Sequence, residues 1–173
     1  YLVETPRLGV VLQKTSKCLK LTAHVDSNLE RKGEGLSTYG YCIYVNGNLI
    51  KAKSKRFAEP TTVTCLAETW ALLDLIPEIN HISKLLTELK REINQITVLC
   101  DNKATVDVFS SLKVSKTVKE LDLRDATIRY KFVKNKKYLI KYVPTKENVA
   151  DMFTKIVKDD VFLKFRERIV AEL

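Results

Sequence analysis

The chain has 173 residues, enough to bury a hydrophobic core, and this length favours a single domain. Its formal net charge of +9, from 30 Lys and Arg against 21 Asp and Glu, favours a polyanionic partner, with nucleic acid ahead of an acidic membrane surface. No run of about 18 apolar residues is present and residues 1–6 lack the layout of a signal peptide, so we expect a soluble intracellular protein.

The first pattern in chain order is a strand over residues 19–26, where apolar and polar side chains alternate and the polar face ends at Asp26. A polar loop over residues 27–38 follows it. Two β-rich runs then flank Asn46-Gly47, a pair that favours a tight hairpin turn. These runs cover residues 39–46 and 48–56.

The middle of the chain alternates helical and strand patterns. Helical spacing of apolar residues covers 66–76, where Pro77 interrupts or kinks the helix, and a second amphipathic stretch covers 79–89. Residues 96–100 are almost wholly apolar, which is typical of a central strand with helices on both faces, and Asp101 follows them.

The last third contains an amphipathic helix over 104–112, a basic helix from about 118 to 133 and a strand over 138–143. Asn148 is placed to cap a helix start, and a last helix covers 161–169. The whole order of elements predicts an α/β fold in which helices cover a mixed sheet.

Four acidic residues, Asp26, Glu68, Asp101 and Asp151, lie where a predicted strand or helix begins or ends. Phosphodiester hydrolysis with two divalent ions requires hard oxygen ligands, and about −4 of carboxylate charge matches +4 on two Mg²⁺. Because ligands bind at the carboxyl ends of strands in open α/β sheets, Asp26 and Asp101 meet there if their strands are neighbours. The four residues therefore predict a two-metal nuclease site.

Each carboxylate also has a purely structural explanation, and these alternatives remain open. Asp26 fits a turn, and Glu68 fits a first helical turn, where acidic residues complement the helix dipole. Asp101 fits a cap of the following helix, and Asp151 fits a capping-box position after Asn148.

The four cysteines are far apart in the sequence and include no C-x-x-C pair. This spacing predicts reduced, buried thiols rather than a disulfide framework or a zinc site. They are Cys18, Cys42, Cys65 and Cys100.

Positive charge is concentrated in residues 113–141, which hold ten basic and three acidic residues and so contribute +7 of the net +9. Lysine-rich helices are commonly just solvated surface. The density of basic residues in this segment nevertheless favours contact with a phosphate backbone.

Several short segments, spread over nearly the whole chain, match one known family in that family's order. They are residues 1–9, Val25-Asp26-Ser27, 37–42, 53–55, Ala67-Glu68, Cys100-Asp101-Asn102, Leu123-Arg124 and 142–155. Together they resemble the RNase H domain at the C-terminal end of the Pol polyprotein of copia-type LTR retrotransposons, the pseudoviruses.

The resemblance implies the RNase H fold, an α/β fold with a five-stranded mixed sheet and helices on both sides. It implies that Asp26, Glu68, Asp101 and Asp151 are the catalytic residues and the ligands of two Mg²⁺ ions, for which Mn²⁺ substitutes. The implied reaction is hydrolysis of the RNA strand of RNA–DNA hybrids during reverse transcription.

A hybrid is expected to be bound in two ways. Side chains beside the carboxylates would contact 2′-hydroxyls of the RNA strand, and basic side chains would contact phosphates of the DNA strand. The first group is Ser27, Asn28, Thr64 and Asn102, and the second is Lys119, Arg124, Lys134, Lys136 and Lys137.

The resemblance also divides the chain into the end of a connection segment, residues 1–18, and the RNase H domain, residues 19–173. The preceding polymerase is absent, so the chain would be an excised domain whose partners are a hybrid and the reverse transcriptase domain of the same polyprotein. The implied location is cytoplasmic, in virus-like particles, without a membrane.

The sequence departs from the family at residues 63–69 and 119–122, where the usual flanks of the glutamate and a usual His are replaced. Residues 146–148 also lack the His that cellular RNases H carry. These changes concern turnover and substrate placement rather than metal binding. A weakened or inactive module that binds nucleic acid or a partner protein, and a DNA-cutting relative, remain alternatives.

Overall fold

The computed structural model describes residues 4–13, 18–29, 37–57, 64–111, 123–135 and 137–172. Its elements in chain order are β1 (Leu8–Gly9), β2 (Leu19–Asn28), β3 (Thr38–Val45), β4 (Asn48–Arg56), α1 (Thr64–Glu88), β5 (Ile93–Cys100), α2 (Lys103–Ser110), α4 (Leu123–Lys134), β6 (Tyr138–Tyr142), the 3₁₀ helices η1 (Thr145–Glu147) and η2 (Val149–Phe153), α5 (Asp159–Arg166) and β7 (Ala171–Glu172).

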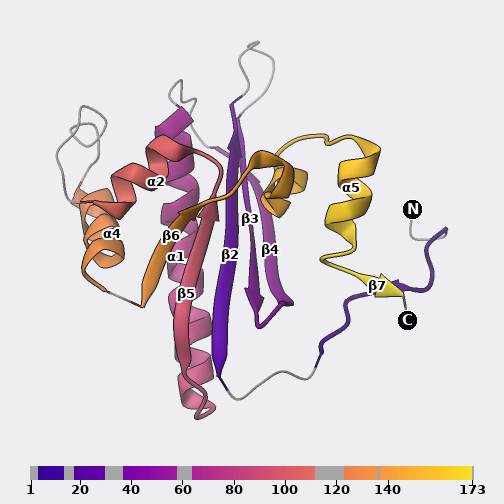
Figure 1. Ribbon diagram of the computed structural model, residues 1–173, viewed down its shortest axis with the longest axis horizontal. Helices are drawn as coiled ribbons and strands as arrows, with labels where there is room; N and C mark the ends of the chain where they lie inside the picture. The colour runs from indigo at the N-terminus through magenta and orange to yellow at the C-terminus, as the bar shows by residue number, and fades with distance from the viewer. Residues whose placement is uncertain are drawn as a thin grey trace.

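The main sheet has five strands in the order β4-β3-β2-β5-β6. β2 pairs antiparallel with β3 and parallel with β5, so the sheet is mixed. Helices α1, α2 and α4 cover one face, while η2 and α5 lie on the other (Figure 1). The predicted α/β architecture, a five-stranded mixed sheet with helices on both sides, is confirmed.

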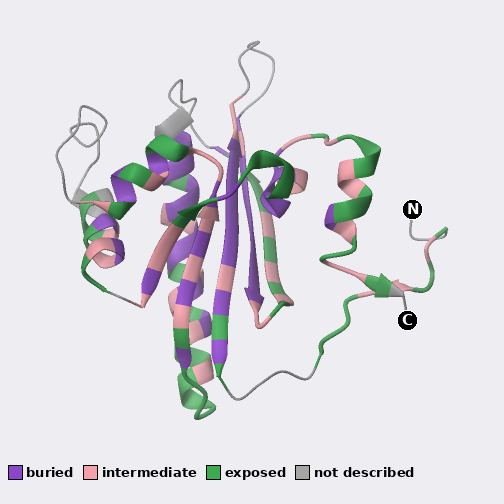
Figure 2. Ribbon diagram, in the orientation of Figure 1, coloured by how far each residue is buried: buried purple, intermediate pink, exposed green. Residues whose placement is uncertain are grey.

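The two faces of the sheet have hydrophobic cores of unequal size. The larger core packs α1, α2 and α4 against the sheet and includes fully buried Leu21, Leu72 and Ile96. The smaller core contains Cys42 and Tyr44 of β3, Val149 of η2 and Phe165 of α5. β2 is consequently buried along most of its length (Figure 2). The alternation in residues 19–26 predicts a strand with one solvent-facing side, and this side is instead covered by the smaller core.

The hairpin predicted around Asn46-Gly47 is confirmed. Both residues have positive φ, 48° at Asn46 and 83° at Gly47, as the two central positions of a type I′ turn require. The turn joins β3 and β4 as neighbouring antiparallel strands.

One predicted helix boundary, the break at Pro77, was wrong. Residues 64–88 form one helix rather than two, with Pro77 inside it at an exposed position, because Leu75, Ile76 and Ile79 pack on the core on both sides of the proline. The basic helix α4 is described from residue 123, and its predicted start at 118 lies outside the described residues. Asn148 caps a 3₁₀ helix, not an α-helix.

The chain ends meet in a second, two-stranded sheet, in which β1 pairs antiparallel with β7 (Figure 1). Cys42 and Cys100 are free and buried as predicted, whereas Cys18 is exposed, and the Cys65 side chain lies outside the described part. None of the helices within the described ranges has the length and apolar character needed to cross a bilayer.

Candidate metal and nucleic-acid site

The topology brings together the ends of two strands that each lead to an aspartate. β2 and β5 run parallel and pair Val25 with Cys100. The next residue on each strand is a carboxylate, Asp26 and Asp101, so both stand at the same edge of the sheet. The adjacency that the sequence only allowed is therefore confirmed.

Glu68 reaches this edge from the first turns of α1, where its side chain is 2% exposed. Its Oε1 accepts hydrogen bonds from the backbone N–H and the hydroxyl of Ser27, at 3.1 and 2.8 Å. Its Oε2 lies 3.7 Å from the Cys100 thiol. These contacts fix the glutamate between the ends of β2 and β5.

Asp26, Glu68 and Asp101 form a group in which one carboxylate oxygen of each lies within 4.8 Å of the others. The Thr145 hydroxyl donates to Oδ2 of Asp101 at 2.7 Å, which orients that carboxylate. Three carboxylate oxygens this close together could hold a divalent metal ion.

Asp151 lies in η2, on the opposite face of the sheet from α1, and is 4% exposed. It is outside the group of three, but Lys155 links it to Asp26 through contacts of 2.9 Å to Oδ2 of Asp151 and 3.9 Å to Oδ2 of Asp26. Its Oδ1 is buried without a hydrogen-bond partner. An unpartnered buried carboxylate oxygen is suited to a ligand such as a cation.

Electrostatics reflect the crowding of carboxylates. Burial raises the pKa of Asp26 to about 7, with Asp151 adding to the rise and the Thr154 hydroxyl, which donates to Asp26, opposing it. Burial, followed by the charge of Asp26, raises the pKa of Glu68 well above its ordinary value. Burial also raises the pKa of Asp151, although Lys155 lowers it. The site favours protons or cations.

The predicted RNA-strand contacts have structural partners of their own. Ser27 is buried against Glu68, and Asn28 donates to the Thr154 carbonyl at 3.5 Å. Asn102 caps α2 by accepting from the Thr105 N–H at 3.2 Å. The Thr64 side chain lies outside the described residues.

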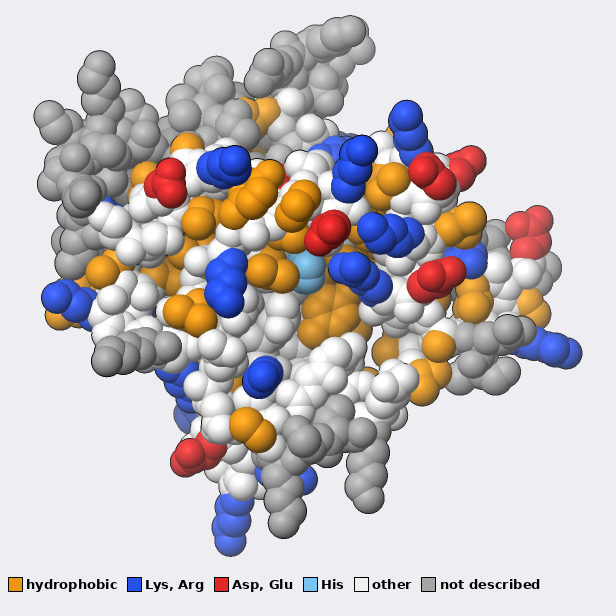
Figure 3. Space-filling view, viewed as in Figure 1, with side chains coloured by type: hydrophobic (Ala, Val, Ile, Leu, Met, Phe, Trp, Pro, Cys, Tyr) orange, Lys and Arg blue, Asp and Glu red, His pale blue; other side chains and the backbone are white. Residues whose placement is uncertain are grey.

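The predicted DNA-strand contacts are described only in part. Lys134 is exposed at the end of α4 and Lys137 is partly exposed. Lys119, Lys136 and the side chain of Arg124 lie outside the described residues. On the face shown in Figure 3, lysine and arginine side chains are spread across the molecule rather than gathered at one end.

One basic residue of the 113–141 segment has a structural role. Arg129 is 6% exposed, and its Nε donates to the Val108 carbonyl at 2.6 Å while Nη2 donates to the Ser111 carbonyl. It therefore holds α4 against the C-terminal end of α2 and does not contribute to a surface that binds phosphates.

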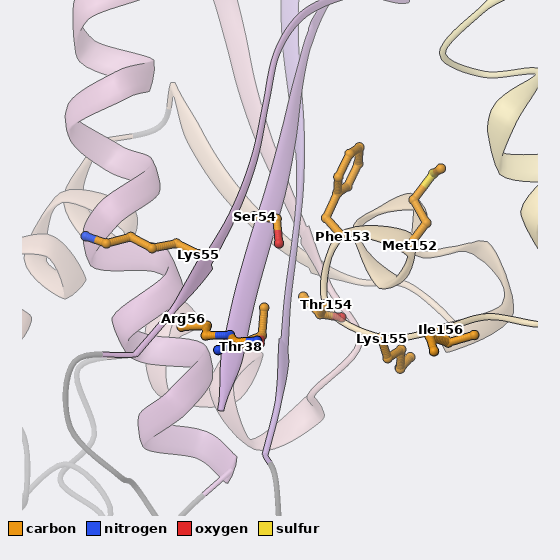
Figure 4. A pocket seen from close by; sticks show the side chains of 9 residues that line it. All are labelled: Thr38, Ser54, Lys55, Arg56, Met152, Phe153, Thr154, Lys155 and Ile156. Carbon is orange, nitrogen blue, oxygen red and sulfur yellow. The ribbon is translucent and has the colours of Figure 1, made fainter. Parts of the chain in front are cut away.

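A groove of about 510 Å³ lies beside the carboxylates, between the paired strands β3 and β4 and the segment that follows Asp151 (Figure 4). Its lining contains Thr38, residues 54–56 and residues 152–156. Arg56 and Lys155 are among them, whereas the Lys55 side chain points away towards α1 (Figure 4), and no lining residue is acidic. The groove is thus suited to an anionic ligand.

Sequence reasoning missed the residues that hold the carboxylates. Thr145, Thr154 and Lys155 each contact one or two of them, and Asn148 ties η2 to β2 by donating to the Val25 carbonyl at 2.9 Å. The signals available in the sequence were their position within six residues of Asp151 and their place in the segment 142–155 that resembles the family.

No protein-family model matches the chain. The Ty1-NL2 and Ty1-DR6 Gag-Pol polyproteins of Saccharomyces cerevisiae are each 29% identical to it over 142 residues, which is 79% of this chain. The chain spans 8% of the length of these curated relatives.

Among solved structures, LC11-RNase H1 isolated from compost superposes with a TM-score of 0.61 at 21% identity, covering 78% of this chain and 92% of that one. LC11-RNase H1 in complex with an RNA/DNA hybrid superposes with a TM-score of 0.59 at 19% identity, covering 78% of this chain and 94% of that one. The N-terminal RNase H domain of a Mycobacterium tuberculosis protein gives 0.55 at 16% identity, covering 86% and 97%.

These similarities confirm the resemblance found in the sequence. The chain is similar to retrotransposon Pol polyproteins of the copia type and has the RNase H fold.

Proposed function

We propose that this chain is a ribonuclease H domain that hydrolyses the RNA strand of RNA–DNA hybrids with divalent metal ions. The observation that carries the proposal is the convergence of Asp26, Glu68 and Asp101 from β2, α1 and the end of β5, with Asp151 adjoining them. Three of these four carboxylates are almost fully buried without an equal number of positive partners among the described residues, a costly arrangement that a bound cation relieves.

The donor set fits Mg²⁺, since all four candidate ligands are carboxylates and one oxygen of Asp151 is unpartnered. We assign Asp26, Glu68, Asp101 and Asp151 as ligands of two Mg²⁺ ions, with Mn²⁺ able to substitute. Two such ions, when bound, supply the charge that activates the attacking water and stabilises the leaving 3′ oxygen, giving a 5′-phosphate and a 3′-hydroxyl.

The chain's own contribution is to fix the carboxylates before substrate arrives. Ser27 holds Glu68, Thr145 holds Asp101 and Thr154 holds Asp26, each through a hydrogen bond from its hydroxyl. Preorganised charge of this kind costs no rearrangement during the reaction, and no side chain has to form a covalent intermediate.

The hybrid would lie across the carboxylate edge of the sheet. The groove lined by Arg56 and Lys155 supports contact with a backbone phosphate there, and Lys134 and Lys137 would extend the contact to the DNA strand. One solved neighbour is described as a complex with an RNA/DNA hybrid, which agrees with this class of substrate.

The wider context follows from the Gag-Pol relatives. We propose that the domain acts during reverse transcription, with the reverse transcriptase domain of the same polyprotein as partner, in cytoplasmic virus-like particles. Residues 1–18 would be the end of a connection segment and 19–173 the RNase H domain, although β1 also pairs with the C-terminal β7.

The test is an RNA–DNA duplex with a separate label on each strand, incubated with Mg²⁺, with Mn²⁺ or with EDTA. Wild-type protein should cut only the RNA strand and only with metal, and Asp101→Asn should abolish cutting while it still binds the hybrid. Asp107→Asn, an exposed carboxylate on α2, is the matched control and should cut normally. Binding without cutting by the wild type would favour a non-catalytic nucleic-acid-binding module, and cutting of DNA would favour a DNA nuclease.

A further inference from the structure

Lys155 places a positive charge inside the carboxylate cluster. Its Nζ lies 2.9 Å from Oδ2 of Asp151 and 3.9 Å from Oδ2 of Asp26. The backbone is fixed at this point, because the Lys155 N–H donates to the Asp151 carbonyl at 3.1 Å in the turn that ends η2. Among the ion pairs of the described residues, no other basic side chain reaches any of the four carboxylates.

The ammonium divides the cluster into two parts. Asp26, Glu68 and Asp101 present oxygens within 4.8 Å of one another and need no contribution from Asp151. Asp151 keeps one buried oxygen without a partner, while its other oxygen is paired with Lys155. Lys155 is therefore paired with both Asp26 and Asp151, so its ammonium already neutralises part of the charge that a second cation would meet at these two carboxylates.

We propose that Lys155 occupies the second cation position of the cluster in the protein free of nucleic acid, so that one divalent ion binds there and a second binds only after the ammonium moves away. This inference rests on the metal site of the proposed function. Its physical basis is that an ammonium and a divalent ion in contact with the same two carboxylates repel each other strongly at close range.

The groove beside the cluster offers the lysine an alternative position. The Lys155 side chain is 34% exposed and also lines this groove, whose lining contains no acidic residue (Figure 4). A phosphate of the nucleic acid in the groove would attract the ammonium away from Asp151. Substrate binding would then open the second cation position, which couples metal loading to the presence of substrate.

The test counts bound ions by calorimetric titration of Mg²⁺ and Mn²⁺ into the protein without nucleic acid. Wild type should bind one ion at the cluster, whereas Lys155→Met should bind two. The affinity of Lys155→Met for the second ion should exceed any affinity of wild type for a second ion by at least tenfold. Lys155→Arg should behave like wild type. Lys20→Met removes one exposed charge at the far end of β2 and should leave the count at one.

Two ions in the free wild type, or one ion in both wild type and Lys155→Met, would overturn the inference and leave the proposed nuclease intact. Two ions in the free wild type would overturn the inference even if Lys155→Met does not fold. If Asp101→Asn binds as many ions as wild type does, no ion binds at the cluster. That result would refute the metal site and the proposed function with it.

Discussion

The Asn148 side chain donates a hydrogen bond to the Val25 carbonyl at 2.9 Å across 123 positions of sequence. The same side chain caps η2 by accepting from the Ala150 N–H at 3.3 Å. One fully buried amide thus sets the distance between β2, which carries Asp26, and η2, which carries Asp151.

Replacing this amide should destabilise the protein. Asn148→Ala removes a helix cap and leaves buried backbone groups without their partner, and we expect a loss of about 2 kcal/mol in the free energy of unfolding. Denaturant titration measures it. Asn94→Ala, at an exposed position on β5, should cost no more than about 0.5 kcal/mol, and an equal loss in both variants would contradict the assigned role.

Gly40 is required by the close approach of η2 to the sheet. It pairs with Asp26 across the β2–β3 ladder, and a Cβ at this position would lie 2.7 Å from Cβ of Phe153 and 3.0 Å from the Lys53 carbonyl oxygen. Gly40→Ala should therefore cost about 1–3 kcal/mol and weaken Mg²⁺ binding, because η2 must move away from Asp26.

The control is Gly47→Ala in the hairpin turn, where φ is +83° but no atom lies within 4 Å of the added Cβ. This variant should also lose about 1 kcal/mol, from backbone strain, yet keep its Mg²⁺ affinity. Calorimetry and thermal unfolding separate the two effects, and unchanged Mg²⁺ affinity in Gly40→Ala would refute the steric explanation.

Stability without metal should decrease as pH rises. Burial raises the pKa of Asp26 to about 7 from 3.8, so the folded state holds this proton more tightly than the unfolded chain does. The free energy of unfolding should then fall between about pH 4 and about pH 7. In EDTA we expect Tm between pH 5 and pH 8 to change less favourably in wild type than in Asp26→Asn, by roughly several degrees, because only wild type loses the Asp26 contribution.

Mg²⁺ should reverse this trend, because ion binding requires the deprotonated carboxylates and competes with protons. The rise in Tm on adding Mg²⁺ should be larger at pH 8 than at pH 5. An identical pH profile in wild type and Asp26→Asn would show that Asp26 does not titrate as its burial implies.

Hybrid binding should depend steeply on salt if α4 contacts phosphates. Lys134→Met should lower the slope of log K against log salt by about 1 and weaken different hybrid sequences equally. Lys84→Met is the matched control, because Lys84 is exposed near the end of α1 away from Glu68 and pairs with Glu88. A slope unchanged by Lys134→Met would exclude α4 from the interface.

Much of the fold could be predicted from local pattern. Three local patterns each predicted a strand or a turn, and all three are confirmed. They are the alternation in residues 19–26, the Asn46-Gly47 turn and the apolar run before Asp101. The single helix through Pro77 could not be predicted, since packing on both sides of the proline outweighs the lost hydrogen bond.

For the site, the pattern gave the positions of four carboxylates but not their partners. Register between β2 and β5 places Asp26 beside Asp101, and register is a property of the whole sheet. Thr154 and Lys155 reach Asp26 across more than 120 positions, and neither the hydrophobic pattern nor the spacing of charges around them predicts this contact. Arg129, counted with the basic surface, is instead buried.

The most direct test of the carboxylate centre is an anomalous-scattering map from crystals of the free protein soaked in saturating Mn²⁺. We predict a peak coordinated directly by carboxylate oxygens of Asp26, Glu68 and Asp101. Saturated crystals with no peak among these three side chains, or with manganese bound only elsewhere on the chain, would contradict the account.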